Sequence, residues 1–144
     1  MHEFWKIVEE RPRGLGKGAR VYVSLNRRGE IAMNAEAFKR INRPASVTLM
    51  YDAERRRIGV KFPVALDRNF FPVRKYGRGG RNCVIRASRL LKQFGLRVDE
   101  TLVFNEVQTT ELNGEPMLIL PLDNARAITR RRPGGDDLRE EWRP

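Results

Sequence analysis

Alternation of apolar and polar positions predicts short strands along most of the chain. VYVSLN (21–26) and EIAMN (30–34) flank an Arg-Arg-Gly turn and predict a hairpin. In AEAFKRI (35–41) the apolar positions take the spacing of one helical face, which predicts a short helix that Pro44 ends. SVTLMYD and RRIGVKF, within 46–62, predict a second hairpin around an Asp-led turn. The predicted unit is strand, turn, strand, short helix, hairpin.

The same order of elements is predicted a second time. FFPVRKY (70–76) and CVIRA (83–87) are typical of strands around the turn GRGGRN, and SRLLKQF (88–94) predicts a short helix. TLVFNEV (101–107) and MLIL (117–120) are expected to form the last hairpin, across a wide loop TTELNGEP. Apolar positions also correspond between the two units. The matched positions are Met33 with Ile85, Ala37 with Leu90, and Ile41 with Phe94.

Two such units suggest one closed domain. One unit alone leaves sheet edges unpaired, and two could close a barrel between them. The predicted fold class is therefore α+β, mostly β: a pseudo-symmetric barrel of two β-β-α-β-β halves with short helices. The expected parts are a basic N-terminal arm (1–20), a single barrel domain (21–123) with halves 21–66 and 67–123, and a charged, disordered C-terminal tail (124–144).

The net charge of the chain indicates what kind of partner it binds. The 144 residues carry 29 Lys and Arg against 18 Asp and Glu, a formal charge of +11. Nine basic residues and no acid lie between Arg68 and Arg97, whereas 98–128 holds six acids and one arginine. An anionic partner is indicated, nucleic acid before a membrane surface, although a solvated basic face explains part of the clustering.

The remaining residue types limit the classes of function that we expect. Cys83 is the only cysteine, and no run of 18 apolar residues or signal peptide is evident, so we expect a soluble cytoplasmic protein without a membrane partner. GRGGRN opens a strand and lacks the Gly-Lys-Ser/Thr ending of a phosphate loop. With His2 as the only histidine, the chain has no base for a nucleophile and no metal-ligand cluster. We expect no enzyme activity, no cofactor and no metal.

The two units also resemble a known family. GEIAMNAEAFKRI and GRNCVIRASRLLKQFGL are similar to the strand-helix core of AbrB-like swapped-hairpin (SpoVT-AbrB) proteins, and two copies in one chain resemble the MraZ branch. Asn34 and Arg86 stand where the family has proline. Gly80-Arg81 keeps the Gly-Arg ending of the MraZ Asp-x-x-x-Arg signature, and Gly29-Glu30 does not. The resemblance implies a DNA-binding transcriptional regulator or DNA-organising factor.

The resemblance also implies a binding site. The turns before the second strand of each unit are expected to lie together on one face, where their arginines contact duplex DNA. Glycines let such turns approach a sugar-phosphate backbone, and arginines bind phosphate as a fork. The expected nucleic-acid-binding residues are Arg20, Arg27, Arg28, Arg74, Lys75, Arg78, Arg81, Arg86 and Arg89. The alternative is that the glycines only make tight turns and the arginines are solvated.

Other interpretations stay open. Aromatic residues in strands are usually core, but Tyr22, Tyr76, Phe70 and Phe71 could instead stack on bases. The arginines 55–57 at a hairpin tip are expected only to be solvated. The competing functions are a small protein-interaction subunit of a larger assembly, and an RNA or single-strand binder. A homo-oligomer or a larger complex is compatible with the sequence.

Overall fold

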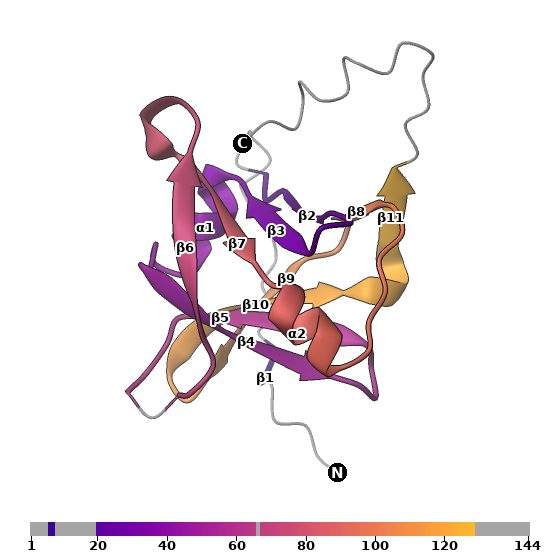
Figure 1. The fold of residues 1–144 in the computed structure, drawn as a ribbon. Helices are drawn as coiled ribbons and strands as arrows, with labels where there is room; N and C mark the ends of the chain where they lie inside the picture. Colours follow the sequence, from indigo (N-terminus) through magenta and orange to yellow (C-terminus); the bar gives the residue numbers. More distant parts are fainter. Residues whose placement is uncertain (1–5, 8–19, 66, 129–144) are drawn as a thin grey trace.

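The described part of the protein is mostly β, with two short helices (Figure 1). A computed structural model describes residues 6–7, 20–65 and 67–128. The strands in this part of the chain are β1 (Lys6–Ile7), β2 (Val23–Leu25), β3 (Glu30–Met33), β4 (Ser46–Asp52), β5 (Arg57–Lys61), β6 (Phe70–Tyr76), β7 (Asn82–Arg86), β8 (Thr101–Phe104), β9 (Gln108–Leu112), β10 (Glu115–Pro121) and β11 (Ala125–Ile128). The helices are α1 (Ala35–Arg40) and α2 (Ser88–Gln93), with 3-10 turns η1 (Arg78–Gly80) and η2 (Leu122–Asn124).

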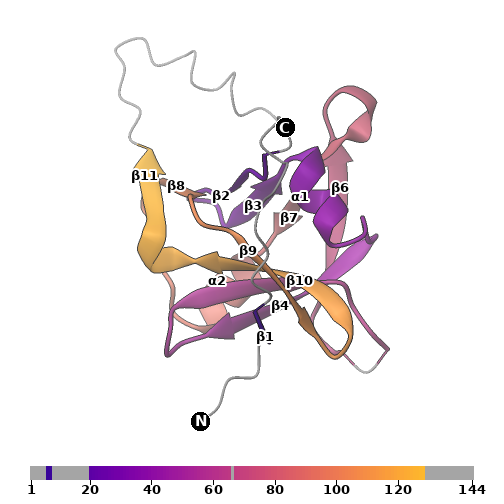
Figure 2. The same ribbon diagram turned by 180° about the vertical axis from the view of Figure 1, so that it is seen from behind.

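All described strands join one antiparallel sheet in the order β1-β9-β10-β5-β4-β6-β7-β3-β2-β8-β11. The sheet is open: its edge strands are β1 and β11, which Figure 2 shows well apart. The predicted closed barrel is therefore wrong for the described chain. Both edge strands are short: β1 has two residues and β11 has four. Short edge strands leave few unpaired backbone groups exposed.

The last hairpin is formed by β9 and β10 and is not the predicted one. This difference in pairing leaves the sheet open. Asn113 and Gly114 have φ of 58° and 80°, the left-handed pair that a two-residue hairpin turn needs. They join β9 to β10, with Met117 opposite Thr110. β8 therefore pairs with β11 rather than with β10, through contacts such as Val103 opposite Arg126. The expected 101–107 to 117–120 hairpin is wrong.

Strands of the two sequence halves alternate in the sheet. β5 and β4 lie between β10 and β6, and β3 and β2 lie between β7 and β8. β6 bridges two regions of the sheet: Phe71 pairs with Val47 of β4, whereas Val73 pairs with Ile85 of β7. One buried apolar cluster takes residues from both halves, including Leu49 and Leu118. The halves therefore share a core.

The shorter elements form largely as expected. The hairpins β2–β3, β4–β5 and β6–β7 and both helices are confirmed. β11 lies in the segment predicted to be a disordered tail, so that prediction is wrong for residues 125–128. Of the arm, β1 pairs with β9 and Arg20 is described, whereas residues 1–5 and 8–19 and the tail beyond Ile128 lie outside the described residues. In the described chain no helix has the length and apolar character to cross a membrane.

Candidate nucleic-acid interface

The two basic turns lie at opposite ends of one strand pair. β3 and β7 are antiparallel neighbours, with Glu30 opposite Arg86 and Met33 opposite Cys83. Each turn immediately precedes its strand, so antiparallel pairing separates them. At about 3.4 Å per residue, the ends of β7 are about 14 Å apart. The expectation that the turns lie together is therefore corrected.

The first turn is braced against the rest of the domain. The Asn26 side-chain oxygen accepts hydrogen bonds from the backbone N–H groups of Arg28 and Glu30, both at 2.9 Å. Gly29 has φ of 84°, and its carbonyl accepts a 2.8 Å bond from the Ala87 N–H at the start of α2. A Cβ on Gly29 would lie 3.0 Å from the Ser88 Cα. Gly29 therefore serves packing, and only Arg27 and Arg28 of this turn are exposed.

The second turn projects from the body of the protein. Figure 1 shows the β6–β7 loop standing out at the upper left. Gly77, Gly79 and Gly80 have φ of 85°, 69° and 61°, values that favour glycine. Cβ atoms at these positions would approach only side chains of the loop's own hairpin. Backbone at this tip is therefore open to a partner.

The nine predicted residues fall into two groups. Those near the β6–β7 loop, which we call the loop group, are Arg20, Arg74, Lys75, Arg78 and Arg81. Those near the first turn and the start of α2 are Arg27, Arg28, Arg86 and Arg89. All nine side chains are exposed. No member of the loop group forms an ion pair with an acidic residue of the described chain.

The second group is less free to bind a ligand. The Arg89 guanidinium lies 4.2 Å from the centre of the Phe71 ring and donates a 3.3 Å hydrogen bond to the Phe70 carbonyl. Arg86 pairs across the strands with Glu30, which brings a carboxylate into this group. The loop group is therefore the stronger candidate for an anion.

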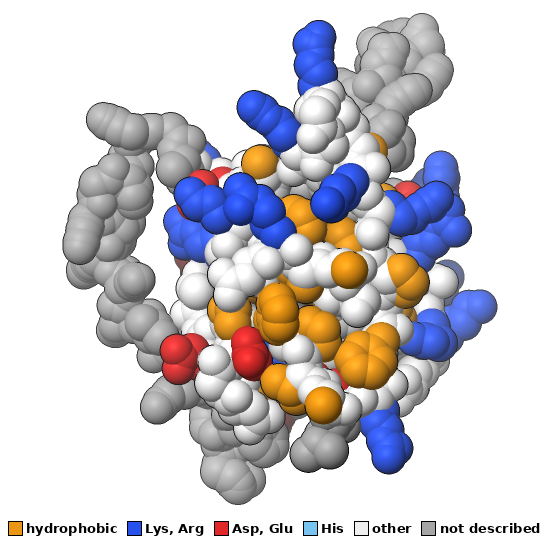
Figure 3. Space-filling view, turned by 90° about the vertical axis from the view of Figure 1, so that its left-hand side faces the viewer, with side chains coloured by type: hydrophobic (Ala, Val, Ile, Leu, Met, Phe, Trp, Pro, Cys, Tyr) orange, Lys and Arg blue, Asp and Glu red, His pale blue; other side chains and the backbone are white. Residues whose placement is uncertain are grey.

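Figure 3 looks onto the side of the protein that carries β6 and the projecting loop. Lys and Arg side chains stand on the loop at the top of this view and lie above and to the right of a hydrophobic area in the middle, and acidic side chains lie at its lower left. Acidic side chains are sparse around the loop. This side of the protein therefore offers positive charge next to apolar surface.

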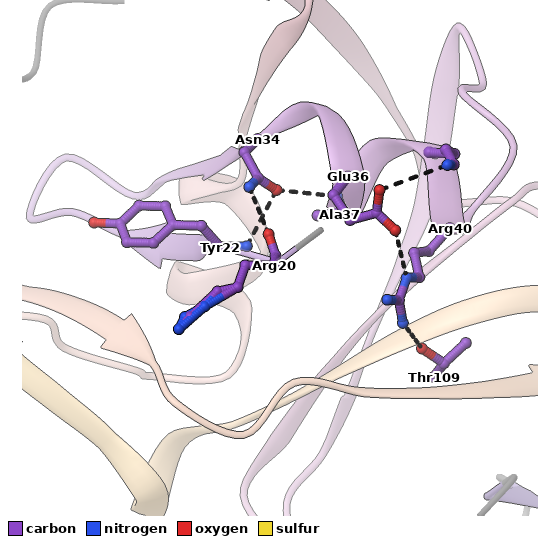
Figure 4. Close-up of polar contacts among 8 residues, drawn as sticks. Arg20, Tyr22, Asn34, Glu36, Ala37, Arg40 and Thr109 are labelled. Carbon is purple, nitrogen blue, oxygen red and sulfur yellow. Dashed lines mark hydrogen bonds and ion pairs between the residues drawn. The ribbon is translucent and has the colours of Figure 1, made fainter. Parts of the chain in front are cut away.

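Asn34 holds the backbone of Arg20, one member of the loop group, beside the end of β3 (Figure 4). Its side-chain oxygen accepts from Ala37 N at 3.0 Å, which caps α1, and from Tyr22 N at 3.1 Å. Its amide donates to the Arg20 carbonyl at 2.9 Å. Asn before a helical pattern favours an N-cap, a sequence signal that could have identified this residue. The bonds hold Arg20 and Tyr22 at the end of β3.

Two tyrosines accompany the loop group. Tyr22 is 44% exposed and Tyr76 is half-buried, so neither is in the core, whereas Phe71 is buried as expected for a core strand. The alternation of side chains along a strand could have shown this from the sequence. Val23 and Leu25 face the core, so Tyr22 faces outward. Burial, with contributions from Cys83 and Tyr22, raises the pKa of Tyr76.

Cys83, the remaining candidate nucleophile, is buried. Desolvation raises the pKa of its thiol to about 12, despite an opposing effect of Lys75. A thiol in this state is inert at neutral pH. In the described chain no three His, Cys, Asp or Glu side chains gather into a metal site.

Comparisons of the chain with protein-family models, with curated proteins and with solved structures find no match. The resemblance to AbrB-like proteins therefore rests on the strand-helix motifs alone.

Proposed function

We propose that this protein is a non-enzymatic nucleic-acid-binding protein whose β6–β7 hairpin contacts the sugar-phosphate backbone. The observation that carries the proposal is the loop group: five exposed cations without acidic partners among the described residues, on and beside a projecting glycine-rich turn. Arginine forks form charge-assisted bonds with phosphate. The formal charge of +11 favours the same partner through long-range attraction.

The proposal places the hairpin, rather than two adjacent turns, at the centre of binding. Arg78 and Arg81 flank the tip glycines, and Arg74 stands on the outer face of β6, opposite the core-facing Val73. Regulation of transcription by the intact protein is a proposal that follows from the family resemblance.

A salt titration tests the proposal. A fluorescein-labelled oligonucleotide is titrated with the full chain at several NaCl concentrations, and the affinity is read from fluorescence anisotropy. With five phosphate contacts, the log–log slope should be about −3.5 on a single strand and about −4.5 on a duplex. Absence of binding to either form at low salt would refute the proposal.

We also propose a distant relation to the swapped-hairpin proteins. Its support is the pairing of β3 with β7, in which Ala32 lies opposite Val84 and Ile31 opposite Ile85. The sequence correspondence that matches Met33 with Ile85 also makes Ala32 and Val84 equivalent positions, and their antiparallel pairing is compatible with a two-fold relation between the halves. The open order of the sheet is the main departure from a barrel.

A second candidate, a protein-interaction subunit, is favoured by exposed aromatic side chains. Phe70 and Phe94 are each 43% exposed. Single exposed aromatics are common on monomers. Purification of the protein with a stoichiometric protein partner, and without nucleic-acid absorbance, would favour this function over the first.

A further inference from the structure

The loop group sits beside a row of outward-facing side chains that crosses four strands. Tyr76 pairs with Asn82 at the end of the β6–β7 hairpin. Met33 pairs with both Cys83 and Val23, so Asn34 and Tyr22 continue the row on the far side. The Asn34 N–H donates to the Tyr22 carbonyl at 3.1 Å. Tyr76, Asn82, Asn34 and Tyr22 therefore lie in sequence along one edge of this part of the sheet.

The two tyrosines stand at the two ends of this row. Residue alternation directs Tyr22 away from the core, since Val23 is fully buried. Figure 4 shows the Tyr22 ring pointing away from Asn34 and α1, on the same side as the Arg20 side chain. Tyr22 also contributes electrostatically to the raised pKa of Tyr76, although 53 residues separate them in the chain. The rings thus border one surface.

The chemistry of this surface suits unpaired bases. Aromatic faces stack on any base, and the amide side chain of Asn82 can donate and accept hydrogen bonds. Arg20 lies two residues before Tyr22, and Lys75 and Arg78 lie within two residues of Tyr76. The chain therefore brings positive charge for a strand's phosphates close to both tyrosines. Between Tyr76 and Arg81, the loop has glycine at 77, 79 and 80, so few side chains stand between the ring and the arginine. In a duplex the base faces are stacked inside the helix and are closed to such rings.

We infer that Tyr22 and Tyr76 form a stacking platform for the unpaired bases of a single-stranded nucleic acid, held by phosphate contacts to the loop group. The inference rests on the proposed function and narrows its substrate class from nucleic acid in general to single strands. The Asn34 bonds hold the Tyr22 half of the platform to β3, and the β6–β7 ladder holds the Tyr76 half.

An abasic oligonucleotide tests the platform without altering the protein. Binding of the full chain is measured for an oligothymidine, for an oligonucleotide of equal length with abasic sites in place of the bases, and for a duplex. Each stacked base is worth a fivefold to hundredfold change in affinity, roughly. We expect the oligothymidine to bind at least about tenfold more tightly than the abasic strand and more tightly than the duplex.

Equal affinity for the thymidine and abasic strands, with both binding, would overturn the inference and leave the proposed function intact. Absence of binding to all three would overturn both. An oligouridine compared with an oligodeoxyuridine of equal length identifies the source of the single strand, because these two differ only in the sugar. Preference for either sugar is compatible with stacking.

Substitutions identify the side chains. Tyr22→Ala with Tyr76→Ala should remove most of the preference for bases over abasic sites, whereas Tyr22→Phe with Tyr76→Phe should retain it. Phe70→Ala is the matched control, because Phe70 has nearly the same exposure as Tyr22 and lies outside the row. Stacking at Tyr22 and Tyr76 would be contradicted if the double phenylalanine variant lost its preference for the oligothymidine over the abasic strand. It would also be contradicted if Phe70→Ala lost as much of this preference as the double alanine variant. Thermal unfolding of each variant verifies that it is folded.

Discussion

At the scale of single residues, the most buried charge of the described chain is Lys61, which is 1% exposed. Its Nζ donates to Asp67 Oδ2 at 2.9 Å and to the Phe62 carbonyl at 3.2 Å. The same carboxylate oxygen accepts from Thr48 Oγ1 at 2.8 Å and from Val64 N at 2.9 Å. These bonds fix the segment that leads from β5 into β6, and so the base of the projecting hairpin.

The network makes stability depend on pH. Burial raises the pKa of Asp67, but bonds from Lys61, Val64 and Thr48 outweigh it and lower the pKa overall. The unfolded chain therefore takes up the proton first as pH falls. The carboxylate contributes stability above the ordinary pKa of about 3.9, and this contribution is lost as pH falls through the lower folded value.

Asp67→Asn should destabilise the protein by about 2–3 kcal/mol at pH 7, because it leaves the Lys61 charge buried without its partner. The variant should also lose less stability than the wild type between about pH 4 and pH 2. Urea unfolding at both pH values measures this. Glu36→Gln, which breaks the partly exposed pair with Arg40, is the control and should cost about 0.5 kcal/mol or less at pH 7. Equal effects would contradict the assigned role of Asp67.

Asn34→Ala should cost about 1–2 kcal/mol, because the helix cap is lost, and should loosen the Tyr22 backbone. Asn34→Asp keeps the acceptor for Ala37 N and Tyr22 N and loses only the donor to the Arg20 carbonyl. We expect the aspartate variant to retain most of the stability in thermal unfolding. Similar melting temperatures for the alanine variant and the wild type would show that the cap is dispensable.

The arginines of the β4–β5 tip show where sequence reasoning falls short at this scale. Arg55 and Arg56 are exposed, as expected for solvated side chains. The Arg57 side chain, in contrast, is only 11% exposed and donates to Asp52 Oδ2 at 2.9 Å. Arg56 bonds Asp123, 67 residues away, at 3.0 Å. A local pattern of charges does not reveal a distant carboxylate, so the second pair could not be predicted from the hairpin alone.

At the scale of elements, the two β-turns that look alike in sequence have different roles. The Asn26–Gly29 turn packs on α2, and the Gly77–Arg81 turn projects. Strand and helix positions followed from periodicity, and 70–76 was predicted with its observed bounds. The Asn-Gly pair at 113–114 was a readable hairpin signal that the wide-loop interpretation missed.

Gly29→Ala should destabilise the protein more than Gly79→Ala. Both positions have positive φ, which alone costs about 1 kcal/mol for alanine. At Gly29 the new Cβ also meets Ser88 backbone at 3.0 Å, whereas at Gly79 the nearest atom is a flexible Arg81 carbon at 3.9 Å. Chemical unfolding of the two variants compares them. Equal losses would show that the first turn is not braced against α2.

At the scale of the whole molecule, alternation of strands from the two halves joins them into one folding unit. β5 pairs with β10, β4 with β6, β3 with β7, and β2 with β8. The sequence predicted two similar units and a shared core, because each unit buries little alone. It did not predict the open order, since pairing between strands far apart in the chain leaves no local pattern.

The fragments 20–65 and 67–128 should therefore each fail to fold alone, because separation exposes the apolar residues of one buried cluster. Mixing the fragments should restore β structure. Circular dichroism of each fragment and of the mixture tests this. A cooperative unfolding transition in either isolated fragment would contradict the shared core.

The central claim, that the β6–β7 hairpin contacts nucleic acid, is tested most directly by two double variants of equal charge. Arg78→Ala with Arg81→Ala removes the arginines of the projecting loop, and Lys92→Ala with Arg97→Ala removes two exposed cations at the far end of α2. Anisotropy with one single-stranded oligonucleotide at fixed salt should show at least about a tenfold loss for the first variant and a much smaller loss for the second. Equal losses would mean that net charge alone, and not this hairpin, holds the nucleic acid.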